Sequence, residues 1–599
     1  MKYKSIPELF ITKAQRFGEK TLVRYQQRAN SDLESISWNE IYDHVESISL
    51  GLAKLGAKAK DNIGLLSITN QKWMCCDLAV LSLGACTVPL YHNCSEDAIF
   101  HIINHAHLDY VFVHNKIQLQ KIRTNFDKLE NLKYVIVLDD RGDIPKNQPR
   151  IITLDDILRI GEKEKKDKPN QFKDQIKKIN DDDLATIIYT SGTTGIPKGV
   201  PLTHKNCLLA ALSIYEYVPL HDKHRMLSFL PLAHVFERVC GELYGLDQGL
   251  TFVYCPVPED IPKLLHAEKI TMMLVVPRIL EKMYAKIMGE LQKQPEMIKD
   301  TILKAIDFGI NYHKKKIANK PISFLENIAY TTAKKTLLAK IKNKLAPHLE
   351  FFVSGGAPLN HEISYFFKAI GIEVLEGYGL TETAAPLTVN PLLRNKTGTV
   401  GIPFGHFDVK LGSDKEILCQ GPSLFPGYYK DEAATNECII DGWFHTGDLG
   451  EFDDEGYLKI IGRKKDLLIT AGGKNVAPTK IEHKLCQSNF INQVVVVGDR
   501  ERYLAALIVV DKDYLYKWNE DSDTKLDLSG KLSESGDLNE LIRDEIDKNS
   551  IGLDNYETIK KFAILDEELS IDGGELTPTM KVKRNVVNEK YSELIVNLF

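Results

Sequence analysis

Short apolar runs alternate with helical patterns through the first 400 residues, and this alternation constrains the fold more than any other feature. The runs lie at 62–66, 110–113, 134–138, 187–190, 251–254, 272–276 and 349–353. Strand-length runs separated by helices are typical of a largely parallel sheet covered by helices. We therefore expect an α/β fold whose ligands bind where loops leave the strand ends.

The later part of the chain follows a different pattern. A chain of 599 residues is too long for one hydrophobic core and should divide into domains. Short strands and glycine turns from about 401 to 462 predict a small β subdomain. Beyond it, strands at 467–470, 493–497 and 504–510 and a helix opened by Pro478 predict a compact α+β module. We expect an N-terminal domain over 1–462 and a C-terminal domain over 463–599, with the polar segment 511–556 as an insertion within the latter.

Composition excludes some classes of function. A net charge of −6 argues against a nucleic-acid-binding protein, which usually carries a basic domain. The first ten residues lack the apolar core of a secretory signal, so we expect a cytoplasmic protein. The apolar stretch 75–90 contains Asp77 and is too short to span a bilayer, which leaves only peripheral membrane contact. The ten cysteines lack metal or redox spacing and are interpreted as reduced thiols.

One segment departs from the acidic balance of the chain. Residues 311–344 hold nine lysines and one acid, Glu326. This run is either a solvated helical face or a basic surface for anionic lipid head groups or a polyphosphate ligand. The sequence leaves the oligomeric state open.

The segment 189–200 gathers small hydroxylated residues, glycines and a lysine in one turn after a buried strand. Backbone N–H groups of glycines, hydroxyls and an ammonium are the donors that a phosphate needs. They are supplied by Ser191, Gly192, Thr193, Thr194, Gly195, Lys198 and Gly199. The spacing is not that of a Walker P-loop, because the first two glycines are three apart and another follows the lysine. Alone, the segment could be a turn without a ligand.

Four further segments carry chemically suggestive residues. In 376–383 an aromatic side chain lies between glycines and a carboxylate follows; in 443–448 an aspartate follows a glycine. Segments 462–465 with 472–475, and 574–584, hold clustered lysines and arginines. Each one alone could be a turn, a linker or a solvated tail.

Together and in this order, these segments resemble the adenylate-forming, AMP-binding superfamily of acyl-CoA synthetases, luciferases and nonribosomal adenylation domains. The resemblance extends from about Ser37 to the C-terminus. Segments 230–239 and 576–584 are similar to those of the long-chain fatty acyl-CoA synthetases. The resemblance implies a long-chain fatty acid:CoA ligase that uses ATP, Mg²⁺ and coenzyme A, and that forms acyl-adenylate and pyrophosphate before acyl-CoA and AMP.

The resemblance also implies roles for matching residues. The ATP β- and γ-phosphates would be held by Thr190, Ser191, Gly192, Thr193, Thr194, Gly195 and Lys198. Adenine and the acyl group would lie along Gly355, Gly356 and Ala357, with adenine also facing Glu376, Gly377, Tyr378 and Gly379. The α-phosphate would meet Thr381, Mg²⁺ would meet Glu382, and the ribose would meet Asp448 and Arg463. His234 would lie beside the carboxylate or acyl pocket.

The C-terminal residues take the remaining roles. Lys465 matches the hinge of a mobile C-terminal domain, and Lys581 matches the lysine of the first half-reaction. Gly472, Gly473 and Lys474 would contact coenzyme A after the domain turns. The chain departs from the family where Met580 replaces the usual glycine.

The proposed chemistry needs no protein nucleophile. Fixed donors and a cation stabilise charge at the α-phosphorus while the carboxylate attacks, and the coenzyme A thiol attacks in the second step. Three alternatives stay open: a fatty acyl-AMP ligase that loads a carrier protein, a non-catalytic acyl- or nucleotide-binding protein, and a phosphotransferase with an unusual P-loop.

Overall fold

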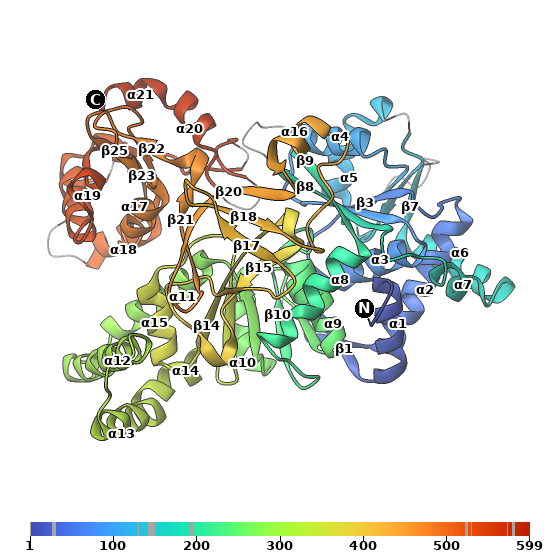
Figure 1. Ribbon diagram of the computed structural model, residues 1–599, viewed down its shortest axis with the longest axis horizontal. Helices are drawn as coiled ribbons and strands as arrows, with labels where there is room; N and C mark the ends of the chain where they lie inside the picture. The colour runs from blue at the N-terminus through green and yellow to red at the C-terminus, as the bar shows by residue number, and fades with distance from the viewer. Residues whose placement is uncertain are drawn as a thin grey trace.

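The computed structural model describes residues 2–26, 31–129, 131–141, 150–191, 197–521, 525–528, 530–571, 573–577 and 581–599. Figure 1 shows the N-terminal sheets at the right and centre and the C-terminal module at the upper left. The α/β class expected from the sequence is confirmed.

The first sheet lies in the N-terminal part of the chain. Its order is β7 (Ile151–Thr153), β6 (Tyr134–Val137), β5 (Tyr110–Val113), β3 (Asn62–Leu66), β4 (Cys86–Leu90), β8 (Leu184–Ser191) and β9 (Pro197–Thr203). Strands pair in parallel from β7 to β8, and β9 returns antiparallel to β8. The helices of this region are α2 (Trp38–Lys54), α3 (Gln71–Ser82), α4 (Glu96–His105), α5 (Lys116–Arg123), α6 (Leu154–Asp167) and α7 (Gln171–Ile176).

The second sheet carries the centre of the molecule. Its order is β16 (Ile402–Pro403), β15 (Ala385–Val389), β14 (Glu373–Leu380), β13 (Phe351–Ser354), β12 (Met272–Val275), β10 (Arg225–Ser228), β11 (Thr251–Tyr254), β1 (Thr21–Gln26) and β2 (Leu33–Ser37). Strands from β14 to β1 pair in parallel, and the outer pairs are antiparallel. Its helices are α1 (Ile6–Phe17), α8 (His204–Ser213), α9 (Tyr244–Gln248), α10 (Ile261–Ala267), α11 (Pro277–Gln292), α12 (Glu296–Ile317), α13 (Phe324–Ala333), α14 (Ala339–Leu345), α15 (His361–Ala369) and the π-helix η3 (Phe236–Leu243).

A small antiparallel sheet follows the second sheet. It contains β17 (Asp408–Leu411), β18 (Glu416–Gln420), β20 (Trp443–Phe452), β19 (Ile439–Ile440) and β21 (Leu458–Arg463), with helix α16 (Glu432–Cys438) beside it. Because β16 pairs with β15, residues 402–403 belong to the second sheet.

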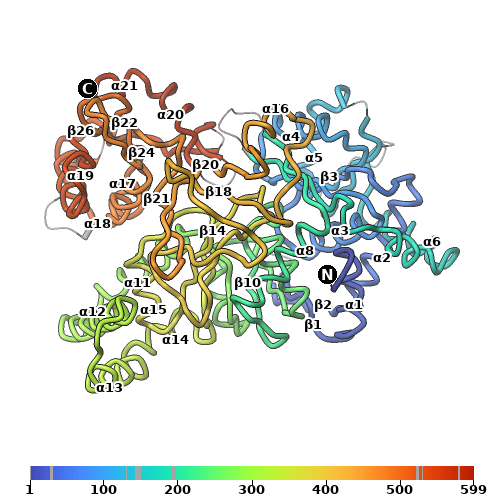
Figure 2. Tube along the Cα trace, in the orientation of Figure 1, coloured from blue at the N-terminus to red at the C-terminus, as the bar shows by residue number. Residues whose placement is uncertain are grey.

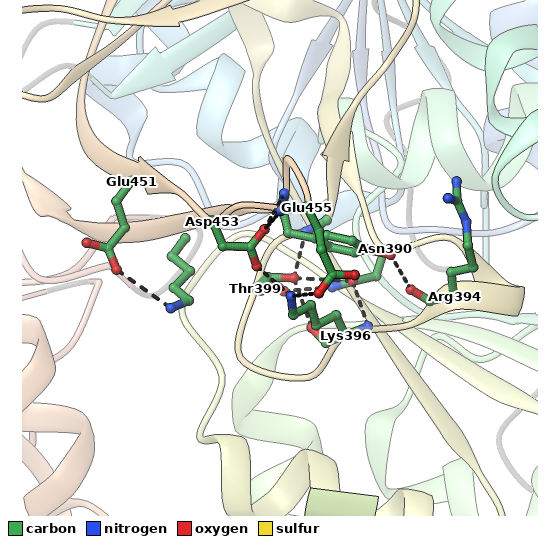
Figure 3. Close-up of polar contacts among 10 residues, drawn as sticks. Asn390, Arg394, Lys396, Thr399, Glu451, Asp453 and Glu455 are labelled. Atoms are coloured by element: carbon green, nitrogen blue, oxygen red, sulfur yellow. Dashed lines mark hydrogen bonds and ion pairs between the residues drawn. The ribbon is translucent and has the colours of Figure 1, made fainter. Parts of the chain in front are cut away.

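The loop after β15 fixes the small sheet against the second sheet (Figure 3). The Nζ atom of Lys396 lies 2.8 Å from Asp453 Oδ2 and 2.6 Å from Glu455 Oε1, at the turn between β20 and β21. The backbone N–H of Asn390 donates to the carbonyl of Glu376 on β14 at 2.9 Å. Strand β14 and the β20–β21 hairpin are therefore held in one fixed arrangement.

The C-terminal module has its own core. Its strands are β22 (Leu468–Ile469) with β23 (Asn475–Val476), and β24 (Ile491–Val497), β25 (Leu504–Val510) and β26 (Ile559–Leu565). Its helices are α17 (Pro478–Leu485), α18 (Lys512–Asp521), α19 (Gly536–Asn549), α20 (Arg584–Lys590) and α21 (Ser592–Val596). Segment 511–556, expected as a polar insertion, supplies α18 and α19, and Leu538, Ile542 and Ile546 of α19 are fully buried in this core.

The apolar stretch 75–90 divides into the end of α3 and strand β4, separated by Gly84 with a φ of 79°. No helix within the described ranges is both long and apolar enough to cross a membrane.

Candidate active site

The segment at 376–383 forms the end of β14 and the following turn. Gly379 lies so close to the next strand that an added Cβ would be 1.7 Å from the carbonyl oxygen of Ala385. Only glycine fits there, and this lets the chain turn sharply into Thr381 and Glu382. Both side chains are largely buried. The turn thus places a hydroxyl and a carboxylate beyond the carboxyl end of β14.

Tyr378, Asp448 and Arg463 form one connected group. The Tyr378 hydroxyl donates to Asp448 Oδ2 at 2.8 Å. Arg463 Nε lies 3.5 Å from Asp448 Oδ1, and the two residues are register partners on β21 and β20. Burial raises the pKa of Asp448, while Arg463 and the Tyr378 hydrogen bond oppose that rise. An aromatic ring, a carboxylate and a guanidinium are thereby fixed side by side.

Lys581 reaches this group from the C-terminal module. Its backbone N–H donates to Thr577 Oγ1 at 3.0 Å, and its carbonyl accepts from the Thr577 N–H at 2.8 Å. The side chain is exposed, yet the surrounding protein desolvates the amine and lowers its pKa; Arg463 lowers it further, whereas Asp448 and Glu382 raise it. The Lys581 amine therefore lies within electrostatic range of the β20–β21 hairpin and of Glu382.

His234 lies near the same lysine. Desolvation, together with the smaller effect of the Lys581 charge, lowers the pKa of His234 to about 4. The ring is thus neutral at pH 7. Its Nδ1 accepts from the Phe236 N–H at 3.2 Å, so the proton resides on Nε2. His234 can donate one hydrogen bond to an anionic group beside Lys581.

The predicted phosphate loop joins two antiparallel strands. Thr190 on β8 and Lys198 on β9 are register partners. Segment 192–196 and the side chain of Ser191 lie outside the described residues, so the predictions for Ser191, Gly192, Thr193, Thr194 and Gly195 remain predictions. A Walker P-loop continues into a helix, whereas this loop continues into strand β9.

Tyr428 links the phosphate loop to Glu382, and no sequence motif pointed to this residue. Its hydroxyl donates to Glu382 Oε1 at 2.8 Å. The Nζ atom of Lys198 lies 5.2 Å from the centroid of its ring, within cation–π range. The available signal was an aromatic pair after Gly427, which no spacing argument singles out.

Gly355, Gly356 and Ala357 follow β13 and lie against the segment that carries His234. An added Cβ on Gly355 would be 3.2 Å from the ring of Phe236. Glu376 is buried on β14, and desolvation raises its pKa to about 8. Its Oε1 has no hydrogen-bond partner within the described part of the chain.

The remaining predicted residues are not gathered here. Gly472, Gly473 and Lys474 form the exposed turn between β22 and β23, where Lys474 Nζ lies 5.9 Å from the ring centroid of Tyr556. Lys465 is exposed in the short 3₁₀ turn Lys464–Asp466. Within the residues that the structure describes, no hydrogen bond or ion pair joins Lys465 or Lys474 to Glu382 or Asp448, although the Lys464–Asp466 turn packs against β20.

Two known protein families match most of the chain. The AMP-binding enzyme family matches residues 10–429, and the AMP-binding enzyme C-terminal domain family matches residues 465–599. The chain belongs to the AMP-binding enzyme family.

Relatives of this AMP-binding enzyme include long-chain acyl-CoA synthetases. The long-chain-fatty-acid–CoA ligase FadD15 of Mycobacterium bovis is 32% identical over 96% of this chain and 94% of its own length. The long-chain-fatty-acid–CoA ligase ACSBG2 of Homo sapiens is 30% identical over 99% and 92%. The resemblance to the long-chain acyl-CoA synthetase subgroup is confirmed.

Solved structures share the fold of this AMP-binding enzyme. The adenylation domain of a carboxylate reductase from Mycobacterium chelonae aligns with a TM-score of 0.76 and 20% identity, over 99% of this chain and 91% of that chain. The anthranilate CoA ligase AuaEII in complex with anthranoyl-AMP aligns with a TM-score of 0.73 and 17% identity, over 98% and 97%.

Proposed function

We propose that this protein is an AMP-forming long-chain fatty acid:CoA ligase. The observation that carries the proposal is the convergence of Lys581 with Glu382, Asp448 and Arg463, which lie in separate segments of the chain. An ammonium, a carboxylate and a ribose-binding pair in one place suit adenylation of a carboxylate. The relatives that are long-chain-fatty-acid–CoA ligases support the acyl class.

In the first step, the fatty carboxylate attacks the α-phosphorus of ATP. A carboxylate-to-phosphorus bond forms, the bond to the β-phosphate breaks, and pyrophosphate leaves. Lys581 neutralises charge on the carboxylate and the α-phosphate, Thr381 donates to the α-phosphate, and neutral His234 donates to the carboxylate. Lys198 and the loop that it ends hold the leaving phosphates.

In the second step, the coenzyme A thiol attacks the acyl carbon and AMP leaves. A carbon–sulfur bond forms and the carbon–oxygen bond to phosphate breaks. Asp448 and Arg463 hold the ribose through both steps, whereas Lys581 must withdraw to admit the thiol. We assign the hinge of this turn to Lys465, and the later coenzyme A contacts to Gly472, Gly473 and Lys474.

Glu382 fits the proposed Mg²⁺. Among the described residues, no group of three or more histidine, cysteine or acidic side chains could hold a metal ion. A single carboxylate completed by substrate phosphates and water is the usual Mg²⁺ arrangement. Glu382 would hold the ion, which neutralises charge on the phosphates.

We further propose domains over 1–462 and 463–599, with the β subdomain at about 401–462. The family matches that end at 429 and resume at 465 support a boundary near the hinge. We place the protein in the cytoplasm, in peripheral contact with the membrane. The ten cysteines are all free in the described chain, as a reducing compartment requires.

The test is fatty-acid-dependent exchange of pyrophosphate into ATP, followed by thioester formation with coenzyme A. We expect both, with AMP as the nucleotide product. Pyrophosphate exchange without transfer of the acyl group to coenzyme A would indicate an acyl-AMP ligase that loads a carrier protein. ADP as product would indicate a phosphotransferase, and absence of both reactions would leave a binding protein.

A further inference from the structure

Helix α13 presents an apolar surface far from the site described above. Phe324 is 78% exposed, Leu325 76% and Ile328 46%. Residues three and four apart are neighbours on one side of a helix, so Ile328 adjoins both Leu325 and Phe324, and the three exposed side chains are here called the α13 apolar face. Contiguous exposed apolar side chains on a water-soluble surface mark an interaction site more often than isolated ones.

The opposite side of α13 is firmly attached to α12. The ring of Tyr330 stacks on Tyr312 at a centroid distance of 4.3 Å, and its hydroxyl lies 2.8 Å from His313 Nε2. The Tyr312 hydroxyl donates to Asn327 Oδ1 at 2.8 Å. Ser323 caps the helix in a reciprocal capping box with Glu326. The apolar face is thus presented on a well-anchored helix, with its inward side already packed.

Unpaired lysines precede and follow α13 in the chain. Lys314, Lys315 and Lys344 form ion pairs with glutamates. Within the described part of 311–344, five exposed lysines form no ion pair: Lys316, Lys320, Lys334, Lys335 and Lys340. In a chain with a net charge of −6, this is a local excess of positive charge.

Helix α13 lies at an edge of the molecule, away from the C-terminal module. Figures 1 and 2 show α12 and α13 at the lower left edge, away from the C-terminal module and from β20. An object bound to α13 would therefore not obstruct the turn of the C-terminal module.

We propose that the α13 apolar face and the five unpaired lysines dock onto an anionic phospholipid bilayer. Phe324 and Leu325 enter the boundary between head groups and acyl chains, and the lysines meet lipid phosphates. Three side chains are too few for a stable protein interface, which needs about 800 Å² from each partner. A few apolar side chains can, however, insert into the surface of a bilayer.

The test measures binding of the full chain to vesicles of phosphatidylcholine, alone or mixed with phosphatidylglycerol. We expect sedimentation with the mixed vesicles only, weakened by added salt. Phe324→Ser with Leu325→Ser should lower the partition coefficient at least about tenfold. The matched control is Leu393→Ser, because Leu393 is 89% exposed outside this surface, and its binding should be unchanged.

A second variant pair tests the charge. Lys320→Glu with Lys335→Glu alters only exposed side chains and should abolish the preference for anionic vesicles. Binding of the wild type to neither vesicle, or undiminished binding of both variant pairs, would overturn the proposal. The proposal would also be overturned if the wild type were a dimer and the serine variant a monomer, since a second copy would then cover the face. The assay contains no ATP or coenzyme A, so its outcome is independent of the ligase reaction.

Discussion

The two halves of the candidate site are held in different ways. Direct contacts join Tyr378, Asp448 and Arg463, and Glu382 is held by Tyr428. Lys581 is held by its own hairpin with Thr577 and meets the others through electrostatics. A fixed half can serve two reactions in succession, whereas a half on a separate module can be present for one and absent for the other.

The largest effect is expected at Lys581, the part of the candidate site that the C-terminal module supplies. Lys581→Ala should reduce pyrophosphate exchange by about a thousandfold, because removal of even one neutral donor to a developing oxyanion costs about a hundred- to a thousandfold. The measurement is the exchange rate at saturating ATP and fatty acid. Lys583→Ala, two residues away, is the matched control and should retain the wild-type rate. Near-normal exchange in Lys581→Ala would remove the lysine from the mechanism.

A substitution in the group formed by Tyr378, Asp448 and Arg463 should slow both half-reactions. Asp448→Asn breaks the carboxylate contacts with Tyr378 and Arg463, and we expect about a hundredfold loss, or about 2.7 kcal/mol, in each half-reaction. The measurement is kcat/KM for exchange and for thioester formation from supplied acyl-AMP. Glu451→Gln lies on the same strand and should change neither rate. Loss confined to adenylation would contradict a shared nucleotide-binding role.

Stability should depend on pH through Glu237, which is buried in the fixed domain. Its pKa is raised to about 8 by desolvation, although Ser228 donates to it. The unfolded chain ionises this carboxyl near its ordinary pKa of about 4.3. Between these values the native state binds more protons, so the free energy of unfolding falls as pH rises.

The free energy of unfolding of Glu237→Gln should therefore rise by about 3.5 kcal/mol relative to that of the wild type between pH 5 and pH 8. Chemical denaturation at both pH values measures this difference. Exposed Glu432→Gln is the control and should show no such gain. An equal offset at both pH values would show that the carboxyl is not protonated in the native state.

The smallest effect is expected at Tyr428, which ties the phosphate loop to the fixed half. Tyr428→Phe keeps the ring under Lys198 but removes the hydrogen bond to Glu382, so we expect about a tenfold loss of adenylation, close to the value of one charge-assisted hydrogen bond. The same variant should weaken Mg²⁺-dependent ATP binding in calorimetry. Tyr429→Phe is the adjacent control. Unchanged Mg²⁺ dependence in Tyr428→Phe would show that Glu382 needs no such support.

Much of the fixed half could be predicted from the sequence. Glycine spacing identifies the turn after β14, since a close backbone approach excludes a side chain at Gly379. The strands at 62–66, 110–113 and 251–254 match β3, β5 and β11 residue for residue, because continuous apolar runs are typical of buried parallel strands.

Other features depend on tertiary packing and could not be predicted. Tyr428 acquires its role from two segments that fold against it, and no local pattern records that. The lysines of 311–344 were visible, but the exposure of Phe324 and Leu325 was not, since a helix pattern alone does not say which apolar residues remain uncovered. The orientation of the C-terminal module follows from contacts such as that between Arg278 and Asn492, which lie far apart in the chain.

The ratio of the two half-reaction rates tests the central claim most directly. Pyrophosphate exchange and thioester formation from supplied acyl-AMP are measured in parallel for the wild type, Lys581→Ala and Asp448→Asn. We expect Lys581→Ala to change this ratio by about a hundredfold or more through loss of exchange alone, and Asp448→Asn to leave it nearly unchanged. Equal loss of both activities in Lys581→Ala would contradict delivery of this lysine for the first step only.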